Sequence, residues 1–265
     1  MFFTVCGEQS ERFPLSELPL CLRRVNPYYL LLRQVRPIER NEVVELLLYN
    51  RNYLYQLLYK AFARKPDMAF LELLTAENTG ESFALLGGEV LEKMPAFVEE
   101  IRAEMSEPRV LDRLEEEYMR LFVGPLKMVA PPWESVYTGE EGMLFQESTL
   151  EVREFYRRFG LIPEGYPRVA DDSLPLELGF MAELAQRSVA AFESGDGEAR
   201  VRNLEGSLEF LNAHLLVWVP RLLEKMANTP TDWLYPQLTL ALNSFLEKDK
   251  ETLTDLLTEG VHAHD

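Results

Sequence analysis

The chain of 265 residues carries 44 acidic and 27 basic side chains, so its formal net charge at pH 7 is −17. This balance argues against nucleic-acid binding and against docking on anionic lipid, because both depend on lysine and arginine. Hydrophobic residues make up 47% of the chain, as in globular proteins that need neither metal nor disulfides to hold a core. A basic partner is the natural complement of such a chain, although many acidic proteins are simply soluble.

Residues 1–38 are expected to form an irregular extension. They hold both cysteines, Cys6 and Cys21, so no disulfide framework or zinc motif is available, and this fits a reducing cytosol. Arg23-Arg24 and the apolar run 28–32 faintly resemble a twin-arginine export signal, but the run is shorter than the roughly 7–15 residues of such a signal. No run of the sequence approaches the length of a membrane span.

Helical periodicity and capping signals follow one another through the next 120 residues. Leucine and phenylalanine at helical spacing mark the first helix, and Pro66 opens the second. Pro95 is expected to bend the third helix, and residues 148–151 form a capping box at the start of a helix that Gly160 ends. Glu107 and Pro108 follow Ser106 at the start of the fourth helix. Helices are thus expected over residues 41–64, 66–74, 88–105, 106–122 and 148–160.

The C-terminal part repeats these signals. Asp172 or Ser173 caps a helix whose inner face carries Leu174, Leu178, Met181 and Ala185. After a break at residues 195–197 comes a long helix, which Pro220 is expected to kink. Two further helices are expected over residues 232–247 and 251–258.

No strand-like alternation is present, so the sequence predicts an all-α fold, a single helical bundle over residues 39–265. Two helical halves, about 39–160 and 171–265, flank the segment 161–170, and the stretch 160–170 holds two glycines and two prolines. Two interpretations of this segment stay open: a hinge between the halves, or an ordered loop.

A catalytic centre is not expected. The three histidines are His214, interpreted as a structural side chain inside a helix, and His262 and His264 near the C-terminus. Phosphate-binding loops, dinucleotide-binding turns, nucleophile elbows and zinc-helix motifs are absent from the sequence. Acidic pairs such as Glu115 and Glu117 are interpreted as a solvated helix face. We therefore expect no catalytic residue, no metal and no cofactor.

The segment 130–137 is unusual because two prolines, Pro131 and Pro132, hold it extended. Such a loop can present Trp133 and Tyr137 to an apolar peptide with little entropy lost on binding. The alternative is that both aromatic residues are core residues that pin the loop to the bundle.

Six segments in fixed order carry a resemblance to a known family. They read EYMRLFVGP, APPWESVY, TLEVREFYRRFGL, DDSLPLELGFMAEL, FLNAHLLVWVPRLLEKM and LALNSFLEKD. In this order, over about residues 41–258, the chain resembles the TorD/DmsD family of redox-enzyme maturation chaperones. The resemblance implies a cytosolic all-helical protein that binds an apo-molybdoenzyme and its twin-arginine signal peptide. The resemblance further implies that such a protein delays the export of the enzyme until the molybdopterin cofactor is inserted.

The resemblance also implies a peptide-binding surface. Two family motifs match this chain, at residues 131–137 and at residues 171–177, but Ser173 stands where the family usually has histidine. Four carboxylates are candidate partners for the leader's arginines, and the aromatic residues are candidate apolar contacts, although Tyr118 and Phe122 can equally be core. The predicted site consists of Tyr118, Phe122, Pro131, Pro132, Trp133, Glu134, Ser135, Tyr137, Asp171, Asp172, Ser173 and Glu177.

The sequence thus predicts a cytoplasmic, non-enzymatic chaperone that is a monomer or a domain-swapped dimer and that contains no integral membrane segment. Its expected partners are a twin-arginine signal peptide and the apo form of a molybdoenzyme catalytic subunit. Two alternatives from other classes remain: an enzyme or carrier that handles molybdopterin guanine dinucleotide, and a structural adaptor.

Overall fold

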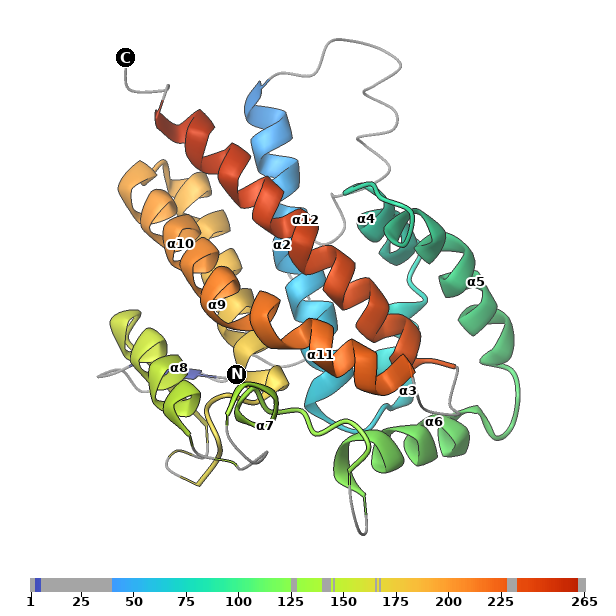
Figure 1. The fold of residues 1–265 in the computed structure, drawn as a ribbon. Coiled ribbons are helices and arrows are strands. Elements are labelled where there is room, and N and C mark those ends of the chain that lie inside the picture. The colour runs from blue at the N-terminus through green and yellow to red at the C-terminus, as the bar shows by residue number, and fades with distance from the viewer. Residues whose placement is uncertain are drawn as a thin grey trace, which may run out of the picture.

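Helices make up most of the chain that the computed structural model describes (Figure 1). The described residues are 3–5, 40–124, 128–139, 144, 146–164, 166, 168–227 and 233–261. The all-α fold is confirmed, because these residues hold only one pair of short strands beside their helices. Both cysteines, the arginine pair of the extension and the two C-terminal histidines lie outside the described residues.

The described part of the N-terminal half contains nine helical elements and one short strand. Here η2 is a 3-10 helix and η3 is a π-helix. In chain order the elements are β1 (Phe3–Val5), α2 (Arg40–Ala63), α3 (Met68–Leu74), α4 (Thr79–Ala84), η2 (Leu91–Lys93), α5 (Met94–Glu104), α6 (Val110–Tyr118), η3 (Met119–Val123), α7 (Ser135–Thr138) and α8 (Glu147–Arg158).

The C-terminal half is built from longer helices, preceded by a short strand. Strand β2 pairs antiparallel with β1, and η4 is a second π-helix. The elements are β2 (Leu161–Pro163), α9 (Leu174–Ser194), α10 (Gly197–Phe210), η4 (Leu211–Leu215), α11 (Leu216–Ala227) and α12 (Tyr235–Val261).

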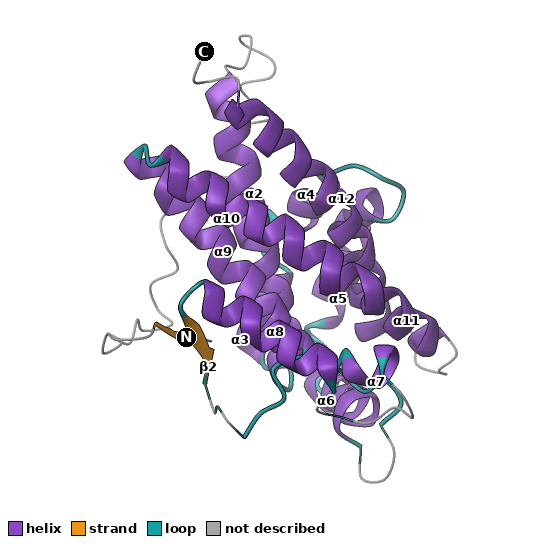
Figure 2. Ribbon diagram, turned by 60° about the vertical axis from the view of Figure 1, so that its left-hand side comes forward, coloured by secondary structure: helices purple, strands orange, loops and turns teal. Residues whose placement is uncertain are grey.

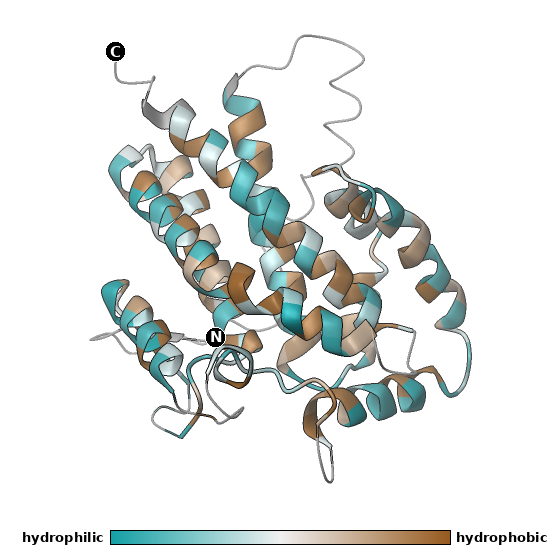
Figure 3. Ribbon diagram, in the orientation of Figure 1, coloured by the Kyte–Doolittle hydropathy of each residue, from teal (hydrophilic) through white to brown (hydrophobic). Residues whose placement is uncertain are grey.

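Helices α2, α9, α10 and α12 form the centre of the molecule (Figures 1 and 2). Helix α9 packs on α2 and on α10, and α12 packs on α10 and α11, so contacts join the two halves. The predicted inner face of α9 is confirmed, because Leu174, Leu178, Met181 and Ala185 are buried. Helix α8, outside this centre, carries both hydrophilic and hydrophobic residues along its length, as amphipathic surface helices do (Figure 3).

Several predicted helix boundaries are wrong. The predicted capping box does not form, since α8 begins at Glu147 with Gln146 at its N-cap and without a side-chain capping bond. Pro95 does not bend a helix, because it lies in the first turn of α5, where its missing N–H costs no bond. Helix α6 begins after Arg109 rather than at Ser106, and the sequence reading missed α4.

The long C-terminal helices also differ from the expectation. The chain changes direction between α10 and α11, where the π-helix η4 interrupts the α-helical pattern, and Pro220 lies inside α11 (Figure 1). The two helices predicted after residue 232 are one helix, α12, which runs through Asp249 without a break.

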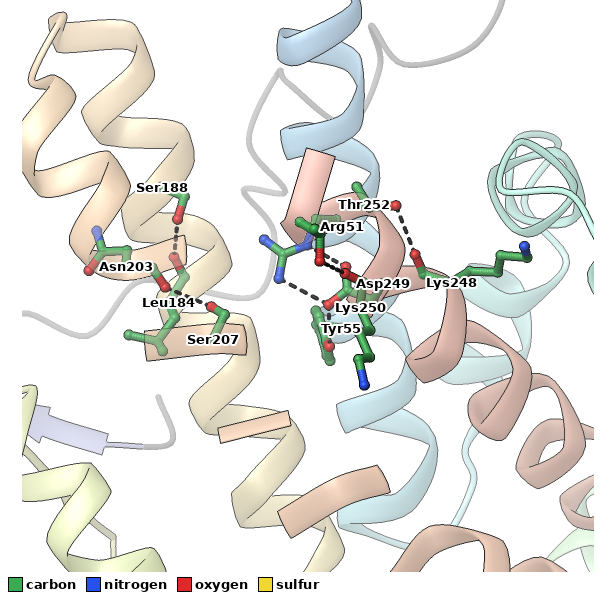
Figure 4. A network of polar contacts seen from close by, with 11 residues as sticks. Arg51, Tyr55, Leu184, Ser188, Asn203, Ser207, Lys248, Asp249, Lys250 and Thr252 are labelled. Atoms are coloured by element: carbon green, nitrogen blue, oxygen red, sulfur yellow. Dashed lines mark hydrogen bonds and ion pairs between the residues drawn. The ribbon is translucent and has the colours of Figure 1, made fainter. Parts of the chain in front are cut away.

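Asp249 stays inside α12 because its carboxylate points into the protein (Figure 4). There it accepts hydrogen bonds from the Arg51 guanidinium, with Nη2 and Oδ2 3.0 Å apart and a second bond from Nε to Oδ1. The Tyr55 hydroxyl donates to the same Oδ2 at 2.6 Å. Arg51 and Asp249 are both fully buried, so this ion pair joins α2 to α12 without contact with water.

Removal of the Asp249 carboxylate should destabilise the protein strongly. The change Asp249→Ala leaves the Arg51 charge buried and unpaired, and we expect a loss of about 3–5 kcal/mol in the free energy of unfolding. Urea unfolding followed by circular dichroism measures this loss. As a control, Lys250→Ala alters an exposed neighbour in the same helix and should stay within about 0.5 kcal/mol of the wild type. A loss below about 1 kcal/mol for Asp249→Ala would contradict the assigned role of the pair.

Candidate functional site

Backbone hydrogen bonds bring the two predicted motifs together. Trp133 and Ser173 form an isolated antiparallel bridge. On either side of it, the Glu134 N–H donates to the Asp172 carbonyl and the Leu174 N–H donates to the Pro132 carbonyl, both at 2.9 Å. The extended loop before α7 is therefore fixed to the start of α9, although some 40 residues separate the two segments in the sequence.

Four acidic residues of these motifs are buried together, and we call them the carboxylate cluster: Glu134, Asp171, Asp172 and Glu177. Glu134 is 3% exposed and the other three are 0% exposed. The sequence reading placed these side chains on an acidic surface, and that placement is wrong. Buried carboxylates need internal partners, because an unpaired buried charge is costly.

Each member of the cluster has a different partner. The Asp172 Oδ2 atom accepts from the Ser135 N–H at 2.8 Å, which fixes the first turn of α7. The Glu134 Oε2 atom lies 2.9 Å from Nδ1 of His214 in η4. The Glu177 Oε2 atom accepts from the indole N–H of Trp218 at 2.9 Å. The interpretation of His214 as a structural histidine is confirmed, since it is buried in this pair.

Asp171 is the member that pairs with an arginine. Arg153 Nη2 and Nε of α8 lie 2.7 and 3.1 Å from Asp171 Oδ2. The Arg153 side chain is 22% exposed, so the pair reaches the surface through its guanidinium. Tyr156, one turn further along α8, donates its hydroxyl to the Asp171 carbonyl at 2.9 Å.

The surroundings of the cluster favour the protonated form of one of its carboxyl groups, that of Glu177. Burial raises the pKa of Glu177 well above its usual value, and the neighbouring Glu134 and Asp172 carboxylates raise it further, against the lowering effect of the Trp218 bond. Burial and the same carboxylates also raise the pKa of Tyr156, which therefore stays a neutral donor. The cluster gathers more acidic groups than the cations paired with it.

Several buried polar atoms around the cluster have no hydrogen-bond partner in the described part of the chain. They include Asp171 Oδ1, Asp172 Oδ1, Glu177 Oε1, Ser135 Oγ and Nε2 of His214. Atoms of this kind can bind a polar group of a ligand, because each retains an unused donor or acceptor. Within the described ranges, no set of three or more histidine, cysteine, aspartate or glutamate side chains is arranged to hold a metal ion.

A small pocket lies beside Asp171. Its cavity volume is only about 30 Å³, far less than the roughly 300–1,000 Å³ of a typical small-molecule site. A side chain from a partner can therefore enter it only where a resident side chain gives way. Its lining combines the apolar residues of β2 with tyrosines and charged residues, and consists of Arg153, Tyr156, Arg157, Leu161, Ile162, Pro163, Tyr166 and Asp171.

The predicted aromatic contacts divide into two groups. Tyr118 and Phe122 are buried and pack with Phe62 and Tyr235, so the alternative that they are core residues is confirmed. Pro131, Pro132, Trp133 and Tyr137 are half-buried at the loop. The Tyr137 ring stacks on Trp218 with centroids 5.5 Å apart, which pins the loop to α11 as the core alternative proposed.

One acidic residue outside the motifs was misread. Glu117 is buried rather than solvated, and its carboxylate accepts from the N–H groups of Leu234 and Tyr235 at 3.3 and 3.1 Å. It thereby caps the start of α12. The partners Arg153, Tyr156 and Trp218 were also missed, because their positions in the sequence carry no signal of the carboxylates they meet.

The raised pKa of Glu177 predicts how stability depends on pH. Between the ordinary glutamate pKa, about 4.3, and the higher folded value, the folded protein binds more protons than the unfolded chain, so stability falls as pH rises. Glu177→Gln imitates the protonated side chain and removes this loss. Its stability relative to the wild type should therefore increase with pH, by up to about 1.4 kcal/mol per pH unit.

Urea unfolding at pH 5, 6.5 and 8 measures this difference. Glu205→Gln is the matched control, because Glu205 is exposed on α10 and its replacement makes the same change in charge. A difference between Glu177→Gln and the wild type that stays constant over the three pH values would contradict the assignment.

A helix that spans a membrane needs about 20 predominantly apolar residues. Within the described ranges, no helix combines the length and apolarity needed to cross a membrane.

A family model described as "Nitrate reductase delta subunit" matches residues 88–224, which are 137 of the 265 residues.

Relatives carry chaperone names. A TorD chaperone of Shewanella pealeana is 27% identical over 214 residues, which cover 77% of this chain and 89% of the relative. A TorD chaperone of Vibrio cholerae is 27% identical over 143 residues, with 54% and 63% covered. A probable Tat proofreading chaperone DmsD of Haemophilus influenzae is 30% identical over 125 residues, with 47% and 54% covered. The chain therefore belongs to the nitrate reductase delta subunit family, the TorD/DmsD family that its motifs resemble.

Proposed function

We propose that this protein is a maturation chaperone that binds the apo form of a molybdoenzyme catalytic subunit and its twin-arginine signal peptide. Family membership supports the chaperone role, as do relatives named TorD chaperone and Tat proofreading chaperone. The role needs binding rather than chemistry, so we propose that the protein is not an enzyme. We also propose that it acts in the cytoplasm, as a monomer or as a dimer that exchanges halves through residues 161–170.

The bonding and position of Asp171 are the observation that supports the proposed binding site. Its Oδ2 already binds a guanidinium, that of Arg153, and its Oδ1 has no partner in the described part of the chain. Of the four cluster members, only Asp171 lines the pocket. Because Asp171 itself is fully buried, we propose that an incoming arginine of the leader binds this carboxylate by replacing Arg153, whose side chain reaches the surface.

The other members of the cluster support Asp171 instead of contacting the leader. Asp172 fixes α7, Glu134 is paired with His214, and Glu177 is bonded to Trp218. We propose that they are positioning residues, which hold the loop and the start of α9 in register. This narrows the predicted set of guanidinium partners from four residues to one.

The apolar part of the leader supplies most of the affinity in this proposal. Exposed charge pairs contribute only about 0.2–1 kcal/mol each, whereas buried apolar area contributes about 25 cal/mol per Å². The half-buried side chains of Pro131, Pro132, Trp133 and Tyr137 offer such area on the loop next to α9. The leader's arginines then set the register of binding and speed the encounter with this acidic protein.

Two substitutions at the ion pair should change leader affinity in opposite directions. Asp171→Asn removes the acceptor charge and should weaken binding about ten- to a hundredfold, since a hydrogen bond to a charged group is worth about 1.5–3 kcal/mol. Arg153→Gln removes the competing guanidinium and should strengthen binding several-fold. Isothermal titration calorimetry with a synthetic leader peptide that contains the paired arginines measures both changes.

Controls separate the ion pair from general charge and from folding. Asp112→Asn makes the same charge change at an exposed position of α6 and should leave the affinity within about twofold, because surface charges at a distance are screened. A peptide with both arginines replaced by lysine should bind the wild type more weakly, since lysine lacks the planar fork of donors. If Asp171→Asn and Arg153→Gln shift the affinity in the same direction, the pair has only a structural role.

A further inference from the structure

Strand β2 is an edge strand, and its one strand partner in the described part of the chain is β1 (Figure 2). The register places Thr4 opposite Ile162, with Phe3 opposite Pro163 and Val5 opposite Leu161. Residues 3–5 thus lie on the segment 161–170, which the sequence left open as either a hinge or an ordered loop. The sequence reading treated this start as an irregular extension, so the strand pair is a correction.

The two strands differ in how firmly the rest of the protein holds them. Strand β2 follows α8 directly and packs against it, with Leu161 and Pro163 buried and Ile162 half-buried. Strand β1 packs chiefly on β2. A ladder of three residues in two strands is marginally stable in water, so β1 is the exchangeable member of the pair.

The pocket described above lies along the same strand. Leu161, Ile162 and Pro163 all line it, together with Asp171 and Arg153. Recognition by strand addition uses these two features together: a backbone edge that supplies affinity and a pocket that selects side chains. The edge of β2 offers both within a few residues of the carboxylate proposed to bind the leader.

We propose that the edge of β2 is a docking site for an extended segment of the client precursor, and that residues 3–5 occupy this site until the client displaces them. The proposal rests on the chaperone function proposed above. The present occupant, Phe-Thr-Val, indicates the chemistry of the client segment: aromatic and β-branched side chains without charge, which favour strands. Because β1 belongs to the same chain, it competes as an intramolecular ligand.

A labelled peptide with the sequence of residues 1–7, carrying Cys6→Ser, tests the edge directly. Fluorescence anisotropy compares its binding to three full-length proteins: the wild type, Thr4→Pro and the control Thr4→Val. Proline cannot join the ladder, whereas valine can, so only Thr4→Pro should open the edge. We expect at least tenfold tighter binding to Thr4→Pro than to the other two proteins. Equal affinity for all three would overturn the proposal.

Two measurements locate the bound peptide. Amides of adjacent residues in an antiparallel strand point to opposite edges, so only one of the Leu161 and Ile162 amides faces β1. Hydrogen exchange at that amide should become faster in Thr4→Pro and slow again when the peptide is added. The additional change Ile162→Pro should abolish peptide binding, while circular dichroism verifies that the helices remain. Binding that survives Ile162→Pro, or unchanged exchange at residues 161–162, would overturn the proposal.

A competition experiment separates this proposal from the proposed function. An unlabelled leader peptide of a client precursor, with an uncharged strand-forming stretch, should displace the labelled peptide from Thr4→Pro. If it binds the protein in calorimetry but does not displace the peptide, client docking on β2 is excluded and the chaperone function stands. If it binds none of the proteins, both proposals fail.

Discussion

Burial of four carboxyl groups where the loop before α7 meets the start of α9 is the constraint on which the candidate site depends. Such groups are tolerated inside a protein only when each finds a donor. Here the donors come from a backbone amide, a histidine, an indole and an arginine, on four different elements. The cluster therefore holds the loop, α8, α9, η4 and α11 in one arrangement. The surface residues of these elements are thereby also fixed relative to one another.

Within this arrangement the four acidic residues are not equivalent. Three of them bond to neutral or histidine donors deep in the protein, while Asp171 bonds to a guanidinium that reaches the surface. The chemistry that recognises an arginine is thus already present between Asp171 and Arg153. A leader arginine in the place of Arg153 makes the same kind of contact with Asp171 that Arg153 makes now. We propose that the adjoining strand β2 adds a backbone contact to this charge contact.

Much of the helical fold could be predicted from local sequence. The periodic leucines of α2 and the inner face of α9 were read correctly, because burial on one face of a helix leaves a 3.6-residue pattern. Asp249 was read as part of a break between two helices because nothing nearby reveals that Arg51, 198 residues away, would pair with it. Glu117 was misread for the same reason: the backbone amides that it caps lie at the start of α12, far away in the sequence.

The candidate site shows the difference between residue identity and residue role. The family motifs selected the loop and the start of α9, and these segments do meet. Their chemistry could not be read from the motifs, since a buried glutamate and an exposed one have the same letter. Arg153, Tyr156 and Trp218 complete the cluster from helices far apart in the sequence, and β1 reaches β2 across more than 150 residues. Long-range contacts of this kind are set by packing, which leaves no local pattern.

The central claim is that a leader's paired arginines bind where Asp171 lines the pocket. Photo-crosslinking tests it most directly, with a leader peptide that carries a benzophenone residue next to the two arginines and with mass spectrometry to locate the product. The account predicts crosslinks to the pocket and loop, on residues 153–166 and 131–137. Crosslinks confined to α5 and α6, on another part of the molecule (Figure 1), would contradict it.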